Sequence, residues 1–137
     1  MPSLPALPLV DRSSAISWAR LIAHHPEALF LDTETTGLDA WAEIVDIAIL
    51  DRDGRVLLNT LVRPEQQIPP EVSAIHGITM EDVRMAPAWH DIASDVLRLL
   101  HARPVVVYNA EFDQRLIHQC CARCGTPVPH ANWQCAM

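Results

Sequence analysis

Residues 29–38, with the sequence LFLDTETTGL, decide how the fold of this chain is interpreted. The apolar run predicts a strand at 28–33 that is buried on both faces. Side chains two positions apart on a strand share a face, so Asp32 and Glu34 place two carboxylates side by side. Such a pair repels and loses solvation unless a cation lies between the two groups. Because Mg²⁺ and Mn²⁺ prefer carboxylate oxygens, the stretch predicts a metal site rather than the polar end of a strand.

A second acidic position follows another apolar strand, predicted at 105–108. Asn109 is suited to cap the helix that follows, and Asp113 lies in the first turn of that helix. If the two strands are neighbours, Asp113 would add a third carboxylate to Asp32 and Glu34. An acid in a first turn is also favoured by the helix dipole alone, so the residues themselves leave both interpretations open.

The rest of the pattern predicts an α/β fold. Three strands joined by turns come first and helices alternate with strands afterwards, which favours a mixed sheet with helices on both faces. An irregular, proline-rich lead-in is expected at 1–11. The predicted helices span 13–24, 71–75, 79–84, 89–101 and 110–123, and the predicted strands span 28–33, 43–50, 55–62, 105–108 and 133–136. Asp46 lies within an apolar strand, where a structural hydrogen bond is the simplest role for it.

Charge and hydropathy exclude several classes of protein. The chain has 10 basic residues, all of them arginine, against 17 acidic residues, a net charge of -7. This balance argues against binding nucleic acid by bulk electrostatics, although bound cations would change the local charge. No apolar run reaches the ~18–20 residues of a membrane span, and the proline-rich start is a poor signal peptide. We therefore expect a cytoplasmic protein that does not contact a membrane.

The four cysteines all lie near the end of the chain, which is not the spacing of a disulfide framework. Cys121 and Cys124, with His118 and His130 nearby, have the composition of a zinc site. Cysteines inside a predicted helix are also common small core residues, and this second interpretation is the favoured one.

Three segments together resemble the motifs of a known family. Residues 31–38, the segment AIHGIT at 74–79 and the segment YNAEFD at 108–113 are similar, in this order, to the DEDD superfamily of 3′-5′ exonucleases. That group includes the proofreading epsilon subunit of bacterial DNA polymerase III. The resemblance implies a ribonuclease H-like fold, a five-stranded mixed sheet flanked by helices. It divides the chain into a lead-in with a helix at 1–27 and an exonuclease domain at 28–137.

The resemblance also implies roles for individual residues. Two divalent cations, Mg²⁺ or Mn²⁺, would be held by Asp32 as a bridging ligand, by Glu34 on the first cation and by Asp113 on the second. The substrates implied are nucleic-acid 3′ ends, single-stranded or frayed, with DNA favoured over RNA, and the partner implied is a DNA polymerase. The residues expected near the terminal nucleotide are Thr35, Thr36, Gly37, Leu38, His76 and Asn109.

The sequence departs from the family pattern after Asp113. Members carry a third motif, a His or Tyr followed by an Asp, but no acidic residue follows Asp113 in this chain. We therefore expect a domain that is incomplete at its C-terminus, and that is by itself nearly inactive and prone to self-association. The alternative functions are a non-catalytic nucleic-acid-binding or interaction module on the same fold, and an RNA 3′-5′ exonuclease.

Overall fold

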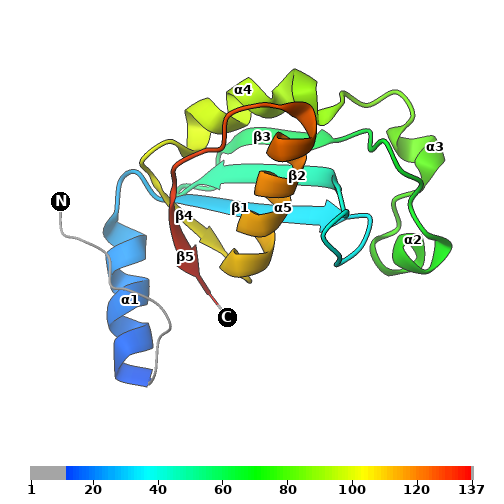
Figure 1. Ribbon diagram of the computed structural model, residues 1–137. Coiled ribbons are helices and arrows are strands. Elements are labelled where there is room, and N and C mark those ends of the chain that lie inside the picture. Colours follow the sequence, from blue (N-terminus) through cyan, green and yellow to red (C-terminus); the bar gives the residue numbers. More distant parts are fainter. Residues whose placement is uncertain (1–11, 137) are drawn as a thin grey trace.

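The computed structural model describes residues 12–136, which form a five-stranded mixed sheet flanked by helices (Figure 1). The lead-in expected at residues 1–11 lies outside the described residues. The helices are α1 (Arg12–His24), α2 (Pro70–His76), α3 (Met80–Val83), α4 (Trp89–Leu100) and α5 (Ala110–Cys124). The strands are β1 (Leu29–Thr35), β2 (Ile44–Asp51), β3 (Val56–Leu61), β4 (Pro104–Val107) and β5 (Asn132–Cys135).

The strand order β3-β2-β1-β4-β5 places β1 at the centre of the sheet. Strand β2 runs antiparallel to both β1 and β3, whereas β4 is parallel to β1 and β5 is parallel to β4. The parallel pairs are joined through helices, as crossover connections require. The predicted fold class, a mixed α/β sheet of five strands, is confirmed.

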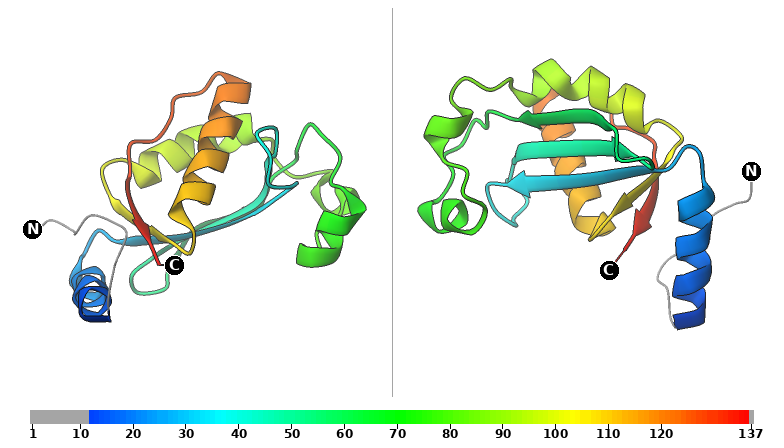
Figure 2. Two further views of the ribbon diagram at one scale, coloured as in Figure 1. Left: turned by 60° about the horizontal axis from the view of Figure 1, so that its bottom comes forward. Right: turned by 180° about the vertical axis from the view of Figure 1, so that it is seen from behind.

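The main core lies between the sheet and the pair α4 and α5, which cover one face (Figure 2). Leu29 and Leu31 of β1 point into this core and are almost fully buried. Because strand side chains alternate, Phe30 and Asp32 point to the opposite face. The apolar stripe of α4 supplies Trp89 and Val96 to the same core, as its helical spacing predicts.

The opposite face of the sheet is covered in part by α1. Trp18 and Ile22 pack with Ala28 and Val106, and the Trp18 indole Nε1 donates a hydrogen bond of 2.7 Å to Oε1 of the buried Gln134. Farther along this face Phe30 remains 38% exposed. None of the helices within residues 12–136 has the length and apolar character needed to cross a membrane.

Strand β1 continues two residues beyond its predicted end. Thr35 pairs with Ile44 of β2 across an irregularity in the register, so Glu34 and Thr35 belong to the sheet and not to a turn. Threonine is enriched in strands, and pairing with β2 extends β1 through Thr35. The extension matters because it fixes the direction of the Glu34 side chain.

Candidate active site

The two acidic residues of β1 lie on the face of the sheet opposite α4 and α5. The strand register sets Asp32 opposite Ala48 and Glu34 opposite Asp46, so all three carboxylates project from one face. The shared face of Asp32 and Glu34 agrees with the sequence prediction. Asp46 is an addition to this group, and its odd spacing from the core-facing Ile47 and Ile49 was the available signal.

Asp113 reaches the same end of β1 from the start of α5. The side chain of Asn109 accepts a hydrogen bond from the Phe112 backbone N–H at 3.5 Å, which confirms Asn109 as the helix cap. Asp113 is buried, and its Oδ1 accepts a 2.7 Å hydrogen bond from the Thr33 hydroxyl. The contact ties α5 to the central strand and brings a carboxylate to the end of β1, within electrostatic range of Asp32 and Glu34.

Burial and mutual repulsion perturb these carboxyl groups. Burial, followed by the charge of Asp32, raises the pKa of Glu34 and also that of Asp46. Burial is also the largest cause that raises the pKa of Asp113; the Thr33 hydroxyl opposes it and Asp32 adds to it. The negative charge of Asp32 therefore acts on all three neighbours, which is the electrostatic pattern of a site that gains from a cation.

The donor chemistry suits a hard divalent cation, but the ligands are not gathered into a finished site. Within residues 12–136, no three His, Cys, Asp or Glu side chains lie as close together as a bound metal ion requires. The packing of the cysteines agrees with the favoured interpretation of them as core residues, since Cys121 is buried in the main core and Cys124 packs against it. Mg²⁺ and Mn²⁺ prefer oxygen ligands of the kind that Asp32, Glu34 and Asp113 offer. These carboxylates lie within electrostatic range of one another, so a divalent cation would complete the site.

The His76 side chain forms hydrogen bonds with backbone groups at the end of β1 and just after α2. Its Nδ1 accepts a hydrogen bond from the Ile78 N–H at 3.1 Å, which leaves the proton on Nε2. Nε2 then donates to the Thr35 carbonyl oxygen at 3.0 Å. Gly77, with a φ of +79°, ends α2 and permits this return of the chain. His76 thus positions the end of β1 in this structure.

The loop after β1 is closed by its own hydrogen bonds. The Thr36 N–H donates to the Glu43 carbonyl at 2.8 Å, and the Glu43 N–H donates to the Thr36 hydroxyl at 3.0 Å. The Thr35 hydroxyl donates to the Gly37 carbonyl at 2.8 Å. Leu38 at the loop tip is 78% exposed. Thr35 and Thr36 are therefore occupied within the loop, while Leu38 is free to contact a ligand.

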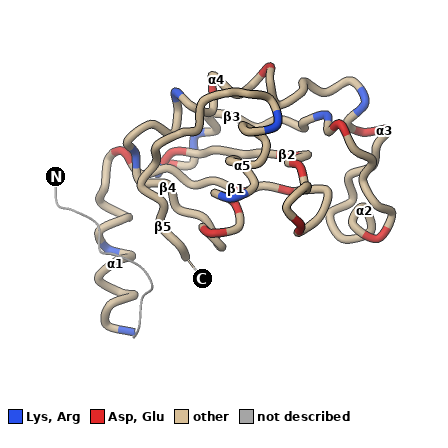
Figure 3. Tube along the Cα trace, in the orientation of Figure 1, with Lys and Arg blue, Asp and Glu red and all other residues tan. Residues whose placement is uncertain are grey.

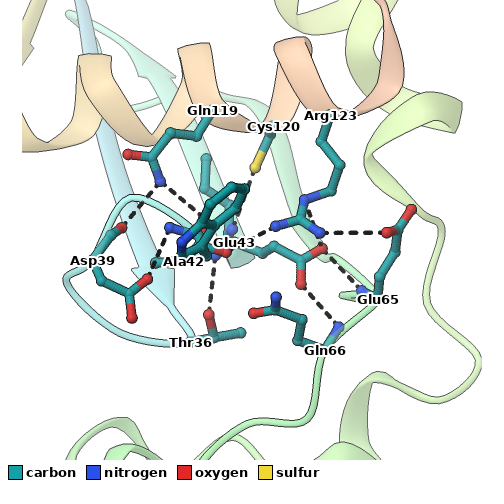
Figure 4. A network of polar contacts seen from close by, with 11 residues as sticks. Thr36, Asp39, Ala42, Glu43, Glu65, Gln66, Gln119, Cys120 and Arg123 are labelled. Atoms are coloured by element: carbon teal, nitrogen blue, oxygen red, sulfur yellow. Dashed lines mark hydrogen bonds and ion pairs between the residues drawn. The ribbon is translucent and has the colours of Figure 1, made fainter.

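A buried carboxylate that the sequence reasoning missed supports this loop (Figure 4). Glu43 is 5% exposed, and its two oxygens accept the backbone N–H groups of Glu65 and Gln66, each at 2.9 Å. Arg123 of α5 lies 3.8 Å from the same carboxylate. The network joins the loop after β1, the segment that leads to α2, and the end of α5.

Comparisons with known proteins show which proteins this chain is similar to. A family model described as "Exonuclease" matches residues 29–135. An uncharacterized exonuclease of Escherichia phage 186 is 52% identical over 93 residues, covering 68% of this chain and 48% of the phage protein. The DNA polymerase III subunit epsilon of Treponema pallidum is 33% identical over 118 residues, covering 82% of this chain and 55% of that subunit. The chain spans about half the length of the curated relatives it matches.

Solved structures give the same picture at the level of the fold. Exonuclease X, solved in complex with 5′-overhanging duplex DNA, superposes with a TM-score of 0.60 at 32% identity, covering 79% of this chain and 58% of that one. Escherichia coli exonuclease I superposes with a TM-score of 0.62 at 22% identity, covering 72% of this chain and 24% of that one. The second likeness supports the ribonuclease H-like fold alone.

Proposed function

Because the chain belongs to the exonuclease family, we propose that it is a metal-dependent 3′-5′ exonuclease that releases nucleoside 5′-monophosphates. Its substrates would be single-stranded or frayed 3′ ends, with DNA favoured over RNA. The observation that carries the proposal is the group of carboxylates at the end of β1: Asp32 and Glu34 share one face of the strand, and the Thr33 hydroxyl binds Asp113 of α5. These three carboxylates come from the two segments that resemble the family's acidic motifs.

Asp32, Glu34 and Asp113 would hold two divalent cations, which polarise a scissile phosphate and lower the pKa of an attacking water. Asp32 would contribute to holding both cations; its charge adds to the effect of burial on the pKa of Glu34 and of Asp113, which supports this role. Thr33 restrains Asp113 through the 2.7 Å hydrogen bond and so keeps this carboxylate at the end of β1. His76 holds the Thr35 carbonyl and would keep the loop in register with the acids.

The charge distribution supports a substrate that is held locally and not by a broad basic surface. The arginine positions are spread along the trace of the described residues (Figure 3). The exposed Leu38, on the loop beside the acids, would contact the terminal base. A short unpaired end needs few phosphate contacts, whereas long duplex binding depends on many.

A polarity assay under enzyme excess tests the proposal. The chain is mixed with single-stranded DNA labelled at the 5′ end or at the 3′ end, with Mg²⁺, with Mn²⁺ or with EDTA. The expected result is release of labelled mononucleotide from the 3′-labelled strand and a shortening ladder from the 5′-labelled strand, in metal only. Enzyme excess makes slow single-turnover cleavage detectable.

The matched variant is Asp32→Asn, which keeps the side-chain size and removes the charge. Cleavage should fall by at least about a hundredfold, the scale of lost metal-assisted catalysis. Cleavage that survives this change, or mononucleotide released from the 5′ end, would contradict the proposal. Strand binding without any cleavage would favour the non-catalytic module, and faster cleavage of the matching RNA would favour the RNA exonuclease.

A further inference from the structure

The loop between β1 and β2 presents a large aromatic side chain to solvent. Trp41 is 70% exposed, although it lies in a short loop whose ends are closed by the hydrogen bonds between Thr36 and Glu43. Exposure of a tryptophan leaves a large apolar surface in water, and such residues are enriched where a protein meets a ligand. Leu38 is exposed on the same loop, next to the candidate active site.

The backbone that carries Trp41 is held by one face of α5. Arg115 donates to the carbonyls of Leu38 and Asp39 at 2.8 and 3.2 Å. Gln119, one turn later, donates to the carbonyls of Asp39 and Ala42 at 3.2 and 3.1 Å (Figure 4). Residues one turn apart share a helix face, so these donors act together on the loop.

The hydrogen bonds at position 41 itself use its backbone atoms. Arg123 donates to the Trp41 carbonyl at 2.9 Å, and the Trp41 N–H donates to the Asp39 side chain at 2.9 Å. The indole is therefore carried on a fixed backbone while its own surface stays exposed. A fixed aromatic surface loses little conformational entropy when a flat ligand stacks on it.

Two hollows lie along α5, and Trp41 lines one of them. One is lined by Ala40, Trp41, Gln119, Ala122 and Arg123. The other shares Gln119 and Ala122 with it and is lined in addition by Glu111, Gln114, Arg115 and His118. The second hollow lies beside the first turns of α5, which also carry Asp113.

The charge of this surface favours an anion. Arg115 donates to neutral carbonyl and amide oxygens, and among residues 12–136 no carboxylate forms an ion pair with it. Arg123 differs, because Glu43 and Glu65 neutralise it. Glu111 is the one carboxylate that lines the hollows. Trp41 and Arg115 line two hollows that share Gln119 and Ala122, and an exposed aromatic side chain together with a guanidinium that has no carboxylate partner is a combination that binds unpaired nucleic acid.

We propose that Trp41 stacks on an unpaired base and that Arg115 contacts a phosphate of the same strand, so that the loop and α5 form a strand-binding surface beside the candidate active site. This inference rests on the proposed function for the identity of the ligand. Stacking accepts any base, so the surface would hold a strand without reading its sequence.

Binding of a short fluorescein-labelled single-stranded DNA in EDTA, followed by anisotropy, tests the stacking. Trp41→Ala should weaken binding about tenfold, whereas Trp41→Phe should stay within about threefold. Neither change removes the backbone hydrogen bonds of the loop. Val56→Ala, at the opposite end of the sheet and also an exposed apolar residue, should leave the affinity unchanged. DNA should quench the intrinsic tryptophan fluorescence of the natural chain. The fluorescence of Trp41→Phe should not change when DNA is added.

The salt dependence tests the phosphate contact. Arg115→Gln should reduce the slope of log K against log salt by about 0.7, the value of one single-strand phosphate contact, and Trp41→Ala should leave that slope unchanged. Arg115→Lys keeps the charge and should restore the slope.

Three outcomes would overturn the inference. They are equal binding by Trp41→Ala and the natural chain, no binding by the natural chain, and a change on Trp41→Ala in self-association but not in DNA affinity. The two proposals fail separately. Trp41-dependent binding without metal-dependent cleavage would refute the proposed exonuclease activity and support the strand-binding surface. Cleavage in the 3′-5′ direction that Trp41→Ala does not affect would support the exonuclease activity and refute the strand-binding surface.

Discussion

At the scale of single residues, the candidate site is organised around the charge of Asp32. Glu34, Asp46 and Asp113 all have raised pKa values, and Asp32 contributes to each. A carboxyl group whose pKa is higher in the folded state binds protons there more tightly than in the unfolded state. Its ionisation therefore lowers stability as pH rises from the ordinary value through the raised one, and the loss persists at neutral pH.

Asp46→Asn should consequently stabilise the metal-free protein. We expect the free energy of unfolding near neutral pH to rise by about 0.5 kcal/mol, the scale of like charges that face each other on two partly exposed strands. Urea denaturation in EDTA measures this change. The gain should disappear below about pH 4, where the aspartic acid is itself protonated in both states. A variant that is less stable than the natural chain at neutral pH would show that Asp46 has a favourable ionised partner instead.

At the scale of elements, one buried carboxylate connects three segments. Each oxygen of Glu43 accepts a backbone N–H, from Glu65 and from Gln66, and Arg123 lies beside them. Glu43→Gln replaces one acceptor oxygen by an NH₂ group that faces a donor. We expect this to cost about 2–4 kcal/mol of unfolding free energy, because a buried N–H loses its partner and Arg123 loses a counter-charge.

Glu65→Gln is the control for that change, since Glu65 pairs with the same arginine at 3.4 Å but its side chain is 70% exposed. The same chemical replacement there should cost less than about 0.5 kcal/mol. Equal costs for the two variants would mean that the ion pair with Arg123, and not the pair of backbone hydrogen bonds, is what stabilises these segments.

The elements also show what the sequence was able to predict. Alternation along β1 placed Asp32 and Glu34 on one face, and Asn109 identified the start of α5, because both signals are local. The hydrogen bonds from Arg115 and Gln119 to the loop after β1 were not predictable in this way. Their spacing marks only a polar stripe on a helix, and their partners lie 76 to 80 residues earlier in the chain.

At the scale of the whole molecule, topology explains why these acids meet. The antiparallel pair β1 and β2 sets Glu34 opposite Asp46, and the parallel pair β1 and β4 brings the start of α5, with Asp113, to the same end of the sheet. The chain carries a net charge of -7, so the repulsion at this end is not relieved by an excess of basic residues. Stability of the whole fold should then depend on a cation that binds there.

Divalent cations should therefore raise the melting temperature. With a dissociation constant of about 1 mM, Mg²⁺ or Mn²⁺ at ~10 mM contributes about 1.4 kcal/mol, a rise of about 3–5 °C for a domain of this size. Asp32→Asn should melt higher than the natural chain in EDTA, because the repulsion on its three neighbours is gone, and should gain little from the metal. Asp53→Asn removes the same charge from the exposed turn between β2 and β3 and should keep the full metal-induced rise, which separates specific binding from screening of the net charge. An equal metal-induced rise in melting temperature in Asp32→Asn and Asp53→Asn would mean that the cation does not bind at the carboxylates around Asp32. Metal binding would then give no support to the proposed site.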